Sequence, residues 1–175
     1  ISNKQVIALK YHTFKNPEIK DVVVYPYLLK EYNKRWFLIV GVEDGTLLNF
    51  VLDRIDGFKP MPHIDYVEPD EELESRFDDI VGVTLFKDKP VENILIWAND
   101  EGSPYIKTKP LHGSQRNVRG DEEKLLREKY QVLQGGCFFR MKCILNYEIE
   151  QLFMSKMDQV VVLEPSVLSD SLRER

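Results

Sequence analysis

The first part of the chain alternates apolar and polar positions in short runs that are typical of β-strands. Gly, Pro, Asn and Asp separate these runs and mark turns. The Asp-Gly pair within Glu43–Thr46 favours a tight hairpin. The pattern predicts a small antiparallel barrel with strands over Val6–Phe14, Asp21–Leu29, Arg35–Val42 and Leu47–Ile55.

The two-residue period of a strand assigns the side chains around Trp36 to opposite faces. Trp36 shares a face with Leu38 and Val40, so it is predicted to lie in the core. Phe37 lies on the other face and is the ring expected beside a ligand. Arg54 ends a run of apolar positions, so it is either a solvent-facing strand end or a charge directed into a pocket.

The second half of the chain mixes helical and strand patterns. Phe58–Pro62 is predicted to interrupt regular structure because proline cannot donate to a ladder. An acidic linker helix with a solvated face is predicted over Glu68–Phe77. Further helices are predicted over Asp121–Lys129 and over Ser166–Arg175, with Ser166 as a cap.

The remaining elements are predicted in the order β-α-β-β-α-β, which indicates a ferredoxin-like split sandwich. They are a strand over Val91–Ala98, an irregular or helical crossover over Gly102–Gln115, a hairpin of Tyr130–Leu133 and Cys137–Leu145 about Gly135-Gly136, a helix over Glu148–Met157 and a strand over Gln159–Leu163. The predicted fold is therefore α+β: an antiparallel β-barrel over 1–62, an acidic linker helix over 63–80 and a ferredoxin-like domain over 81–175.

The net charge of −5 argues against a large duplex-DNA surface. Acidic residues concentrate in 65–79, whereas 1–17 and 102–120 are basic and contain no Asp or Glu. These two segments are therefore candidate anion sites. Guanidinium groups suit phosphate because they donate two parallel hydrogen bonds or stack on a base.

The sequence lacks the common motifs for catalysis and for metal binding. It contains no Gly-rich phosphate loop, Gly-x-Ser-x-Gly, His-Glu-x-x-His or Cys-x-x-Cys motif. Ser114 beside His112 resembles a nucleophile–base pair, but no orienting carboxylate is near it in sequence. We therefore expect no enzyme activity, no cofactor and no metal. Cys137 and Cys143 are six positions apart on one predicted strand, too far to bridge, and are expected to be buried thiols of a reducing cytoplasm.

Several segments, in this order along the chain, resemble the WYL domain and the extension that commonly follows it in bacterial transcriptional regulators. They are Leu9-Lys10-Tyr11 with Phe14, Pro26-Tyr27-Leu28, Trp36-Phe37-Leu38, Asp53-Arg54-Ile55, Pro110–Gln115 and Val160–Pro165. The resemblance implies an SH3-like or Sm-like barrel whose basic and polar residues sense nucleic acids or nucleotide-like ligands. Two departures are Phe37 in place of tyrosine and Asn49 where many relatives have arginine. A pocket with one charge fewer should bind phosphate less tightly, or bind a different ligand.

The sequence thus predicts the effector-sensing and dimerising region of a WYL-type regulator, with the ligand between the barrel and the Lys107–Arg119 segment. Within the site, Arg54 could instead pair with Asp53 or Asp56, Lys30 could simply be solvated, and Tyr11 and His12 could be structural. The predicted ligand-binding residues are Tyr11, His12, Lys30, Arg35, Phe37, Asn49, Arg54, Lys107, His112, Gln115 and Arg116.

The predicted partners are single-stranded nucleic acid or a nucleotide-like effector, and a second copy of the chain. Duplex DNA would be bound only through an N-terminal helix-turn-helix domain that this chain lacks. The start at Ile1 indicates that the chain is cut from a longer protein. No leader and no membrane span are expected, and the location is expected to be cytoplasmic. The alternative is a non-enzymatic protein-interaction module of a phage-defence or nuclease-associated system.

Overall fold

The computed structural model describes residues 1–13, 20–70, 72–86 and 88–174 of the chain. Phe14 and Lys15, which the sequence placed at the end of the first strand and in a basic segment, lie outside these residues. The chain divides into two compact units. The first contains Ile1–Phe77 and Gly82–Lys87, and the second contains Asp78–Val81 and Asp88–Arg175.

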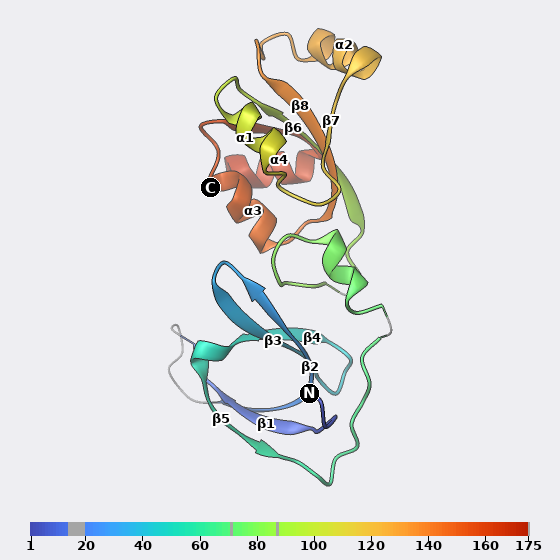
Figure 1. The fold of residues 1–175 in the computed structure, drawn as a ribbon, viewed down its shortest axis with the longest axis vertical. Helices are drawn as coiled ribbons and strands as arrows, with labels where there is room; N and C mark the ends of the chain where they lie inside the picture. Colours follow the sequence, from blue (N-terminus) through green and yellow to red (C-terminus); the bar gives the residue numbers. More distant parts are fainter. Residues whose placement is uncertain (14–19, 71, 87, 175) are drawn as a thin grey trace. The chain divides into compact units, whose positions relative to one another are not determined.

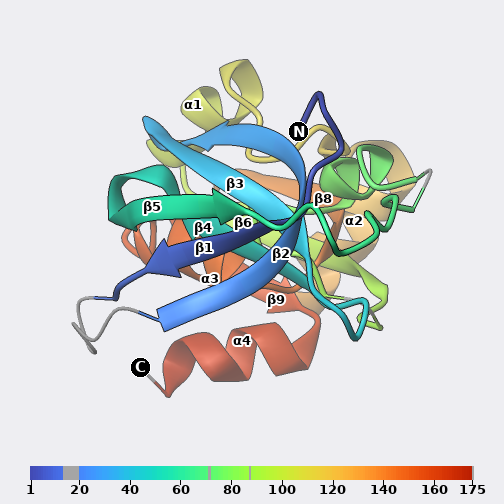
Figure 2. The same ribbon diagram turned by 90° about the horizontal axis from the view of Figure 1, so that it is seen from below.

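The first unit is built on a five-stranded antiparallel sheet with the order β4-β3-β2-β1-β5. Figures 1 and 2 show its strands curling around a shared interior. A small antiparallel barrel was predicted, but no ladder joins β4 to β5 within the described residues, so no closed barrel is observed there. The strands are β1 (Ile7–Tyr11), β2 (Lys20–Tyr32), β3 (Arg35–Gly41), β4 (Leu47–Val51) and β5 (Ile55–Pro60). The buried interior cluster consists of Leu9, Val24, Leu38, Val40 and Phe50.

Two tight turns set the register of this sheet. Asn33 and Lys34 both have positive φ, at 49° and 62°, which is the geometry of a two-residue hairpin between β2 and β3. In the turn between β3 and β4, Gly45 has φ 78° and the Thr46 N–H donates to Asp44 Oδ1 at 2.8 Å. The hairpin predicted from the Asp-Gly pair is confirmed.

The fourth strand is shorter than predicted, and a fifth strand follows it. β4 ends at Val51, and a 3₁₀ turn, η1 (Leu52–Arg54), leads into β5. β5 pairs with β1 as far as Pro60, which lies opposite Ile7, so the predicted interruption at Phe58–Pro62 is wrong up to Pro60. Proline is tolerated here because β5 is an edge strand and needs donors on one side only.

The segment after β5 packs on the first unit without forming the predicted α-helix over Glu68–Phe77. Turns at 72–74 lead into a short 3₁₀ helix, η2 (Ser75–Asp79). Leu73 and Phe77 are buried, and the Tyr66 hydroxyl donates to the Pro26 carbonyl oxygen at 2.7 Å. Crowded acidic residues repel one another along a helix, so burial of these apolar residues decides the local conformation.

The second unit contains a four-stranded antiparallel sheet with the order β7-β8-β6-β9. Its strands are β6 (Val91–Ala98), β7 (Arg116–Asn117), β8 (Cys137–Ile144) and β9 (Val160–Glu164). The predicted strand over Tyr130–Leu133 is wrong: these residues form a turn, and the partner of β8 at that edge is β7. Gly136 has φ 58°, and a Cβ there would lie 2.1 Å from the Ala98 carbonyl oxygen, so this turn requires glycine.

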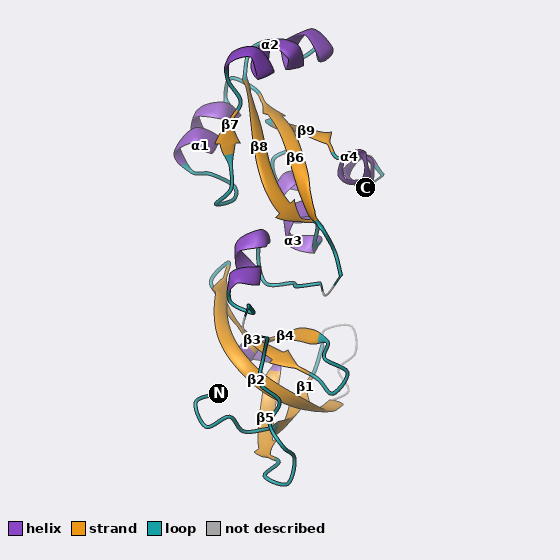
Figure 3. Cartoon of the chain, turned by 90° about the vertical axis from the view of Figure 1, so that its right-hand side faces the viewer, coloured by secondary structure: helices purple, strands orange, loops and turns teal. Residues whose placement is uncertain are grey.

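Four helices complete the second unit. They are α1 (Gly102–Thr108), α2 (Gly120–Lys129), α3 (Tyr147–Met154) and α4 (Ser166–Arg173). Figure 3 shows α2 at the end of the sheet where β8 begins, and its Leu126 packs with Leu95 and Phe138. The buried Asn146 caps α3 by accepting from the Ile149 N–H at 3.0 Å. Ser166 is not the cap of α4, because Pro165 occupies that position and Ser166 is the first helical residue.

Candidate functional site

The 3₁₀ turn η1 brings together predicted ligand residues that are distant in sequence. The His12 backbone N–H donates to the Arg54 carbonyl oxygen at 3.3 Å, so the end of β1 is attached directly to η1. Tyr11 pairs with Ile55, the residue that follows the turn. The Tyr11 ring packs edge-on against Phe50, with 4.7 Å between ring centres, and this contact anchors it to the interior cluster.

Arg35 approaches the same turn from the start of β3. Its Nε lies 4.0 Å from Asp53 Oδ2, and 52% of the side chain is exposed. An exposed pair at this distance is worth at most about 1 kcal/mol, so an incoming phosphate could displace Asp53. On the other side of the turn, His12 Nδ1 lies 2.7 Å from Asp56 Oδ2. We call the following four residues the η1 cluster: Tyr11, His12, Arg35 and Arg54.

An apolar cavity of about 610 Å³ opens beside the η1 cluster within the first unit. Leu52, the first residue of η1, lines it together with Ile55 and Leu38. Phe58 forms another wall and is 63% exposed. A ligand with a charged group and an apolar ring could therefore place the charge at η1 and the ring in this cavity.

Trp36 does not belong to the core, and that prediction is wrong. Its side chain is 49% exposed, although Leu38, two residues further along β3, is buried. The ladder between β3 and β4 begins at Phe37 opposite Val51, so Trp36 lies beyond the end of β4. β2 still pairs with β3 here, through Glu31, but β4 does not reach this position, and the Trp36 side chain stays half in solvent.

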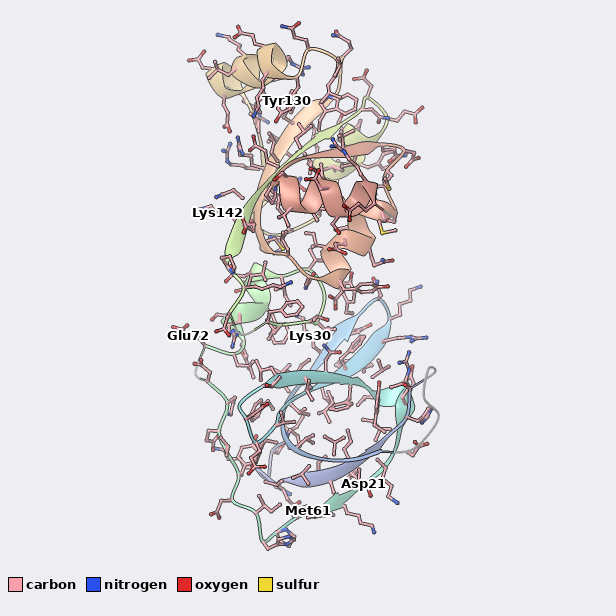
Figure 4. All side chains as sticks on the ribbon, turned by 180° about the vertical axis from the view of Figure 1, so that it is seen from behind. Asp21, Lys30, Met61, Glu72, Tyr130 and Lys142 are labelled. Atoms are coloured by element: carbon pink, nitrogen blue, oxygen red, sulfur yellow. The ribbon has the colours of Figure 1, made fainter. Side chains whose placement is uncertain are left out.

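Three other predicted residues of the first unit lie outside the η1 cluster. The Lys30 ammonium nitrogen is 4.6 Å from the centre of the Phe77 ring, so this lysine makes a cation–π contact (Lys30 is labelled in Figure 4). Phe37 is half-buried and pairs with Lys30 across the sheet. The Asn49 amide donates to the Val83 carbonyl oxygen at 3.4 Å, and Asn49 lines a second cavity.

The predicted residues of the second unit are mostly engaged in structural contacts. The Gln115 side chain donates to the Ile106 carbonyl oxygen at 3.0 Å and accepts from the Leu111 N–H at 2.8 Å, which holds the loop after α1. His112 Nδ1 lies 2.8 Å from Ser114 Oγ, and Ser114 is also bonded to the Lys142 backbone. Lys107 is exposed on α1.

Arg116 belongs to an ion-pair network that the sequence analysis missed. It forms two hydrogen bonds to Glu122, at 3.0 and 3.3 Å, and Arg140 binds the same carboxylate. Arg140 also binds Glu164 at 3.2 Å, and Lys129 binds Glu164 at 3.1 Å. The network joins β7, α2, β8 and β9, which are separated in sequence. The only signal in the sequence was the alternation of apolar and charged residues in β8, which places Arg140 on its polar face.

Acidification is expected to destabilise the second unit through this network. Hydrogen bonds from Arg116 and Arg140 lower the pKa of Glu122. Burial tends to raise the pKa of Glu164, but hydrogen bonds from Lys129 and Arg140 outweigh it and lower the pKa. Because both pKa values are depressed in the folded state, this stabilisation is present above the unfolded carboxylate pKa of about 4.3 and is lost as the pH falls through the folded values.

Thermal unfolding followed between about pH 6 and pH 3 tests this linkage. The melting temperature should fall over this range, and Glu122→Gln should reduce the slope. An unchanged slope in Glu122→Gln would contradict the assignment.

Candidate metal ligands and the thiol of Cys143 can be assessed in the described part of the chain. No group of three or more His, Cys, Asp or Glu residues that could hold a metal ion occurs among the described residues. Cys143 is buried in β8, and burial raises the pKa of its thiol to about 11, which makes it unreactive near neutral pH. Within the described residues, no helix is long and apolar enough to span a bilayer.

Two proteins of known structure align with most of this chain. A CRISPR Cas-related protein of known structure has a similar fold, with a TM-score of 0.52 and 12% identity over 98% of this chain and 45% of that chain. Proteasome accessory factor B/C of Arthrobacter aurescens aligns with a TM-score of 0.38 and 15% identity over 97% of this chain and 24% of that chain. The chain thus spans less than half the length of either protein.

No curated protein matches the sequence significantly. The model of the WYL domain family matches residues 1–60, and this range ends at the last residue of β5. The match to the WYL domain thus covers the five-stranded sheet of the first unit, within a chain of 175 residues.

Proposed function

We propose that this chain is the effector-sensing region of a WYL-type transcriptional regulator, and that it binds single-stranded nucleic acid or a phosphorylated nucleotide at the η1 cluster. The observation that carries the proposal is the convergence of Arg35, Arg54 and His12 on one 3₁₀ turn beside an apolar cavity. The arginines would bind phosphate, and the cavity would receive the base. Asp53 and Asp56 next to them limit the positive charge, which favours a ligand with few phosphates.

A titration with labelled oligonucleotides tests the proposal. Fluorescence anisotropy of the chain with a single-stranded oligonucleotide should show binding with a shallow salt dependence, equivalent to about 2 to 4 neutralised phosphates. A nucleoside monophosphate should compete. Tight duplex binding with a steep salt dependence, or no binding of any oligonucleotide, would contradict the proposal.

We also propose a fold type for each of the two sheets. The first would be an SH3-like or Sm-like barrel that is left open, and the second a ferredoxin-like sandwich. The second assignment is supported by the order β7-β8-β6-β9, in which the last strand adjoins the first, as a split β-α-β-β-α-β arrangement requires. An experimental structure with another strand order would contradict it.

Self-association is also part of the proposal. β9 is an edge strand with Val161 exposed, so it could pair with β9 of a second copy. Light scattering at high micromolar concentration should give about twice the 20.6 kDa chain mass. A mass of one chain would contradict it.

A second candidate function is a docking platform for another protein. It is favoured by exposed aromatic side chains on the first unit, Phe58 at 63% and Trp36 at 49%. A docking platform should have no affinity for nucleotides or oligonucleotides, so the titration above separates the two functions.

A further inference from the structure

The first unit contains a second cavity of about 610 Å³, which is a suitable volume for a small-molecule ligand. Its lining comes from the turn and strand at Gly45–Asn49 and from two segments beyond the WYL match, Val67–Asp70 and Thr84–Phe86. The apolar walls include Leu47 and Leu85. The η1 cluster contributes none of its residues to this cavity.

Two polar side chains with unused hydrogen-bonding capacity line this cavity. Arg76 is half-buried and donates to the Phe86 carbonyl oxygen at 3.1 Å, and no carboxylate pairs with it among the described residues. The half-buried hydroxyl of Tyr27 has no hydrogen-bond partner in the described part of the chain. A guanidinium and a hydroxyl with spare donors favour an acceptor group on a ligand, because a carboxylate can take bonds from both.

The position of the Tyr27 hydroxyl depends on Gly41 at the end of β3. A Cβ at Gly41 would lie 2.4 Å from Tyr27 Oη, so any larger residue would displace the ring. Burial raises the pKa of Tyr27, which keeps the hydroxyl protonated as a donor.

The rim of the cavity limits the charge of the ligand. Glu68 and Asp70 both line it, and Glu68 is bound to Lys4 at 2.5 Å. These two carboxylates would repel a phosphate dianion more strongly than a single carboxylate. We infer that this cavity binds a small organic molecule with one carboxylate, held by Arg76 and Tyr27, and an apolar body packed against Leu47 and Leu85.

The experiment uses the whole chain and 3-phenylpropionate as the probe, with 3-phenylpropionamide and phenyl phosphate as matched compounds. Methyl chemical shifts measured by NMR should move at Leu47 and Leu85 with 3-phenylpropionate, less with phenyl phosphate and not with the amide. Shifts confined to Leu52 and Ile55, or equal binding of the amide, would overturn the inference. Leu52 and Ile55 line the cavity beside the η1 cluster, whereas Leu47 and Leu85 line the second cavity. The NMR result can therefore fail or succeed independently of the oligonucleotide titration.

Three variants and a control decide which side chains bind the probe. Arg76→Gln should weaken 3-phenylpropionate binding by about 10- to 100-fold, and Tyr27→Phe by about 2- to 10-fold. Gly41→Ala should weaken binding at least as much as Tyr27→Phe, because it displaces the ring that carries the hydroxyl. Tyr66→Phe is the matched control: it removes the bond to Pro26 but does not line the cavity, so probe affinity should be unchanged.

If Arg76→Gln does not fold because the bond to Phe86 is lost, Tyr27→Phe still decides, since its hydroxyl makes no bond to a described residue. Unchanged affinity in Tyr27→Phe, or an equal loss in Tyr66→Phe, would overturn the inference.

Discussion

Arg35→Gln and Arg54→Gln are each expected to weaken binding of a single-stranded oligonucleotide by about 1.5 to 3 kcal/mol, roughly 10- to 150-fold. Each substitution removes a guanidinium that the proposal places against phosphate. Arg35 is the cleaner variant, because its side chain is 52% exposed and its pair with Asp53 is long. The melting temperature of the Arg35→Gln protein should therefore stay within a few degrees of the wild-type value.

Arg119→Gln is the matched control for these variants. Arg119 is exposed and belongs to the second unit, so its substitution removes the same charge from a residue outside the η1 cluster. The affinity of the Arg119→Gln protein for the oligonucleotide should change by less than about 3-fold, since a charge outside the cluster alters only the general electrostatic attraction. If Arg35→Gln and Arg54→Gln bind like the wild type, or if Arg119→Gln loses as much, the η1 cluster is not the site.

Ile39→Ala is expected to destabilise the first unit by about 2 to 5 kcal/mol, whereas Trp36→Ala should cost less than about 1 kcal/mol. Both residues lie on β3, but Ile39 is 1% exposed and Trp36 is 49% exposed. Truncating Ile39 leaves a cavity among packed side chains. Truncating Trp36 removes surface that is already half in contact with water.

Urea unfolding should be followed by hydrogen exchange resolved by mass spectrometry, so that the first unit is read separately from the second. If Trp36→Ala lowered the free energy of unfolding as much as Ile39→Ala, Trp36 would belong to the core after all. The same Trp36→Ala protein also serves the titration: the docking-platform alternative predicts a loss of partner binding without any nucleotide affinity.

Local patterns predicted the elements whose structure depends on nearby residues. The β3–β4 hairpin follows from Asp44-Gly45, because Gly45 can adopt a positive φ and Asp44 can accept from the Thr46 N–H. β6 and β8 were predicted nearly to the residue, since both contain β-branched or aromatic side chains that suit a buried strand, among them Ile94, Ile96, Phe138 and Phe139. The helical propensity of Asp121–Lys129 likewise matched α2.

Elements that depend on distant neighbours were predicted incorrectly. Tyr130–Leu133 has the composition of a strand, but α2 and Phe138 use its apolar side chains as packing surface, and β7 occupies the sheet edge. Glu68–Phe77 has the spacing of a helix, yet its described residues form turns at 72–74 and the start of a 3₁₀ helix, with Leu73 buried and Phe77 packed against Lys30. A short stretch of sequence does not reveal either outcome, because the tertiary contacts that override local propensity join residues far apart in sequence.

The sequence alone determined which residue types were available for a site: Arg35 and Arg54 near a WYL-like motif, Tyr11 and His12 at the end of the first strand. Tertiary structure decided which of them meet. The curl of the sheet attaches the end of β1 to η1, which assembles the η1 cluster. Phe77 packs against Lys30, and residues 84–86 line the second cavity together with Asn49. Side-chain type and strand period are properties of a few adjacent residues, but proximity between strands depends on how the whole chain buries its apolar surface.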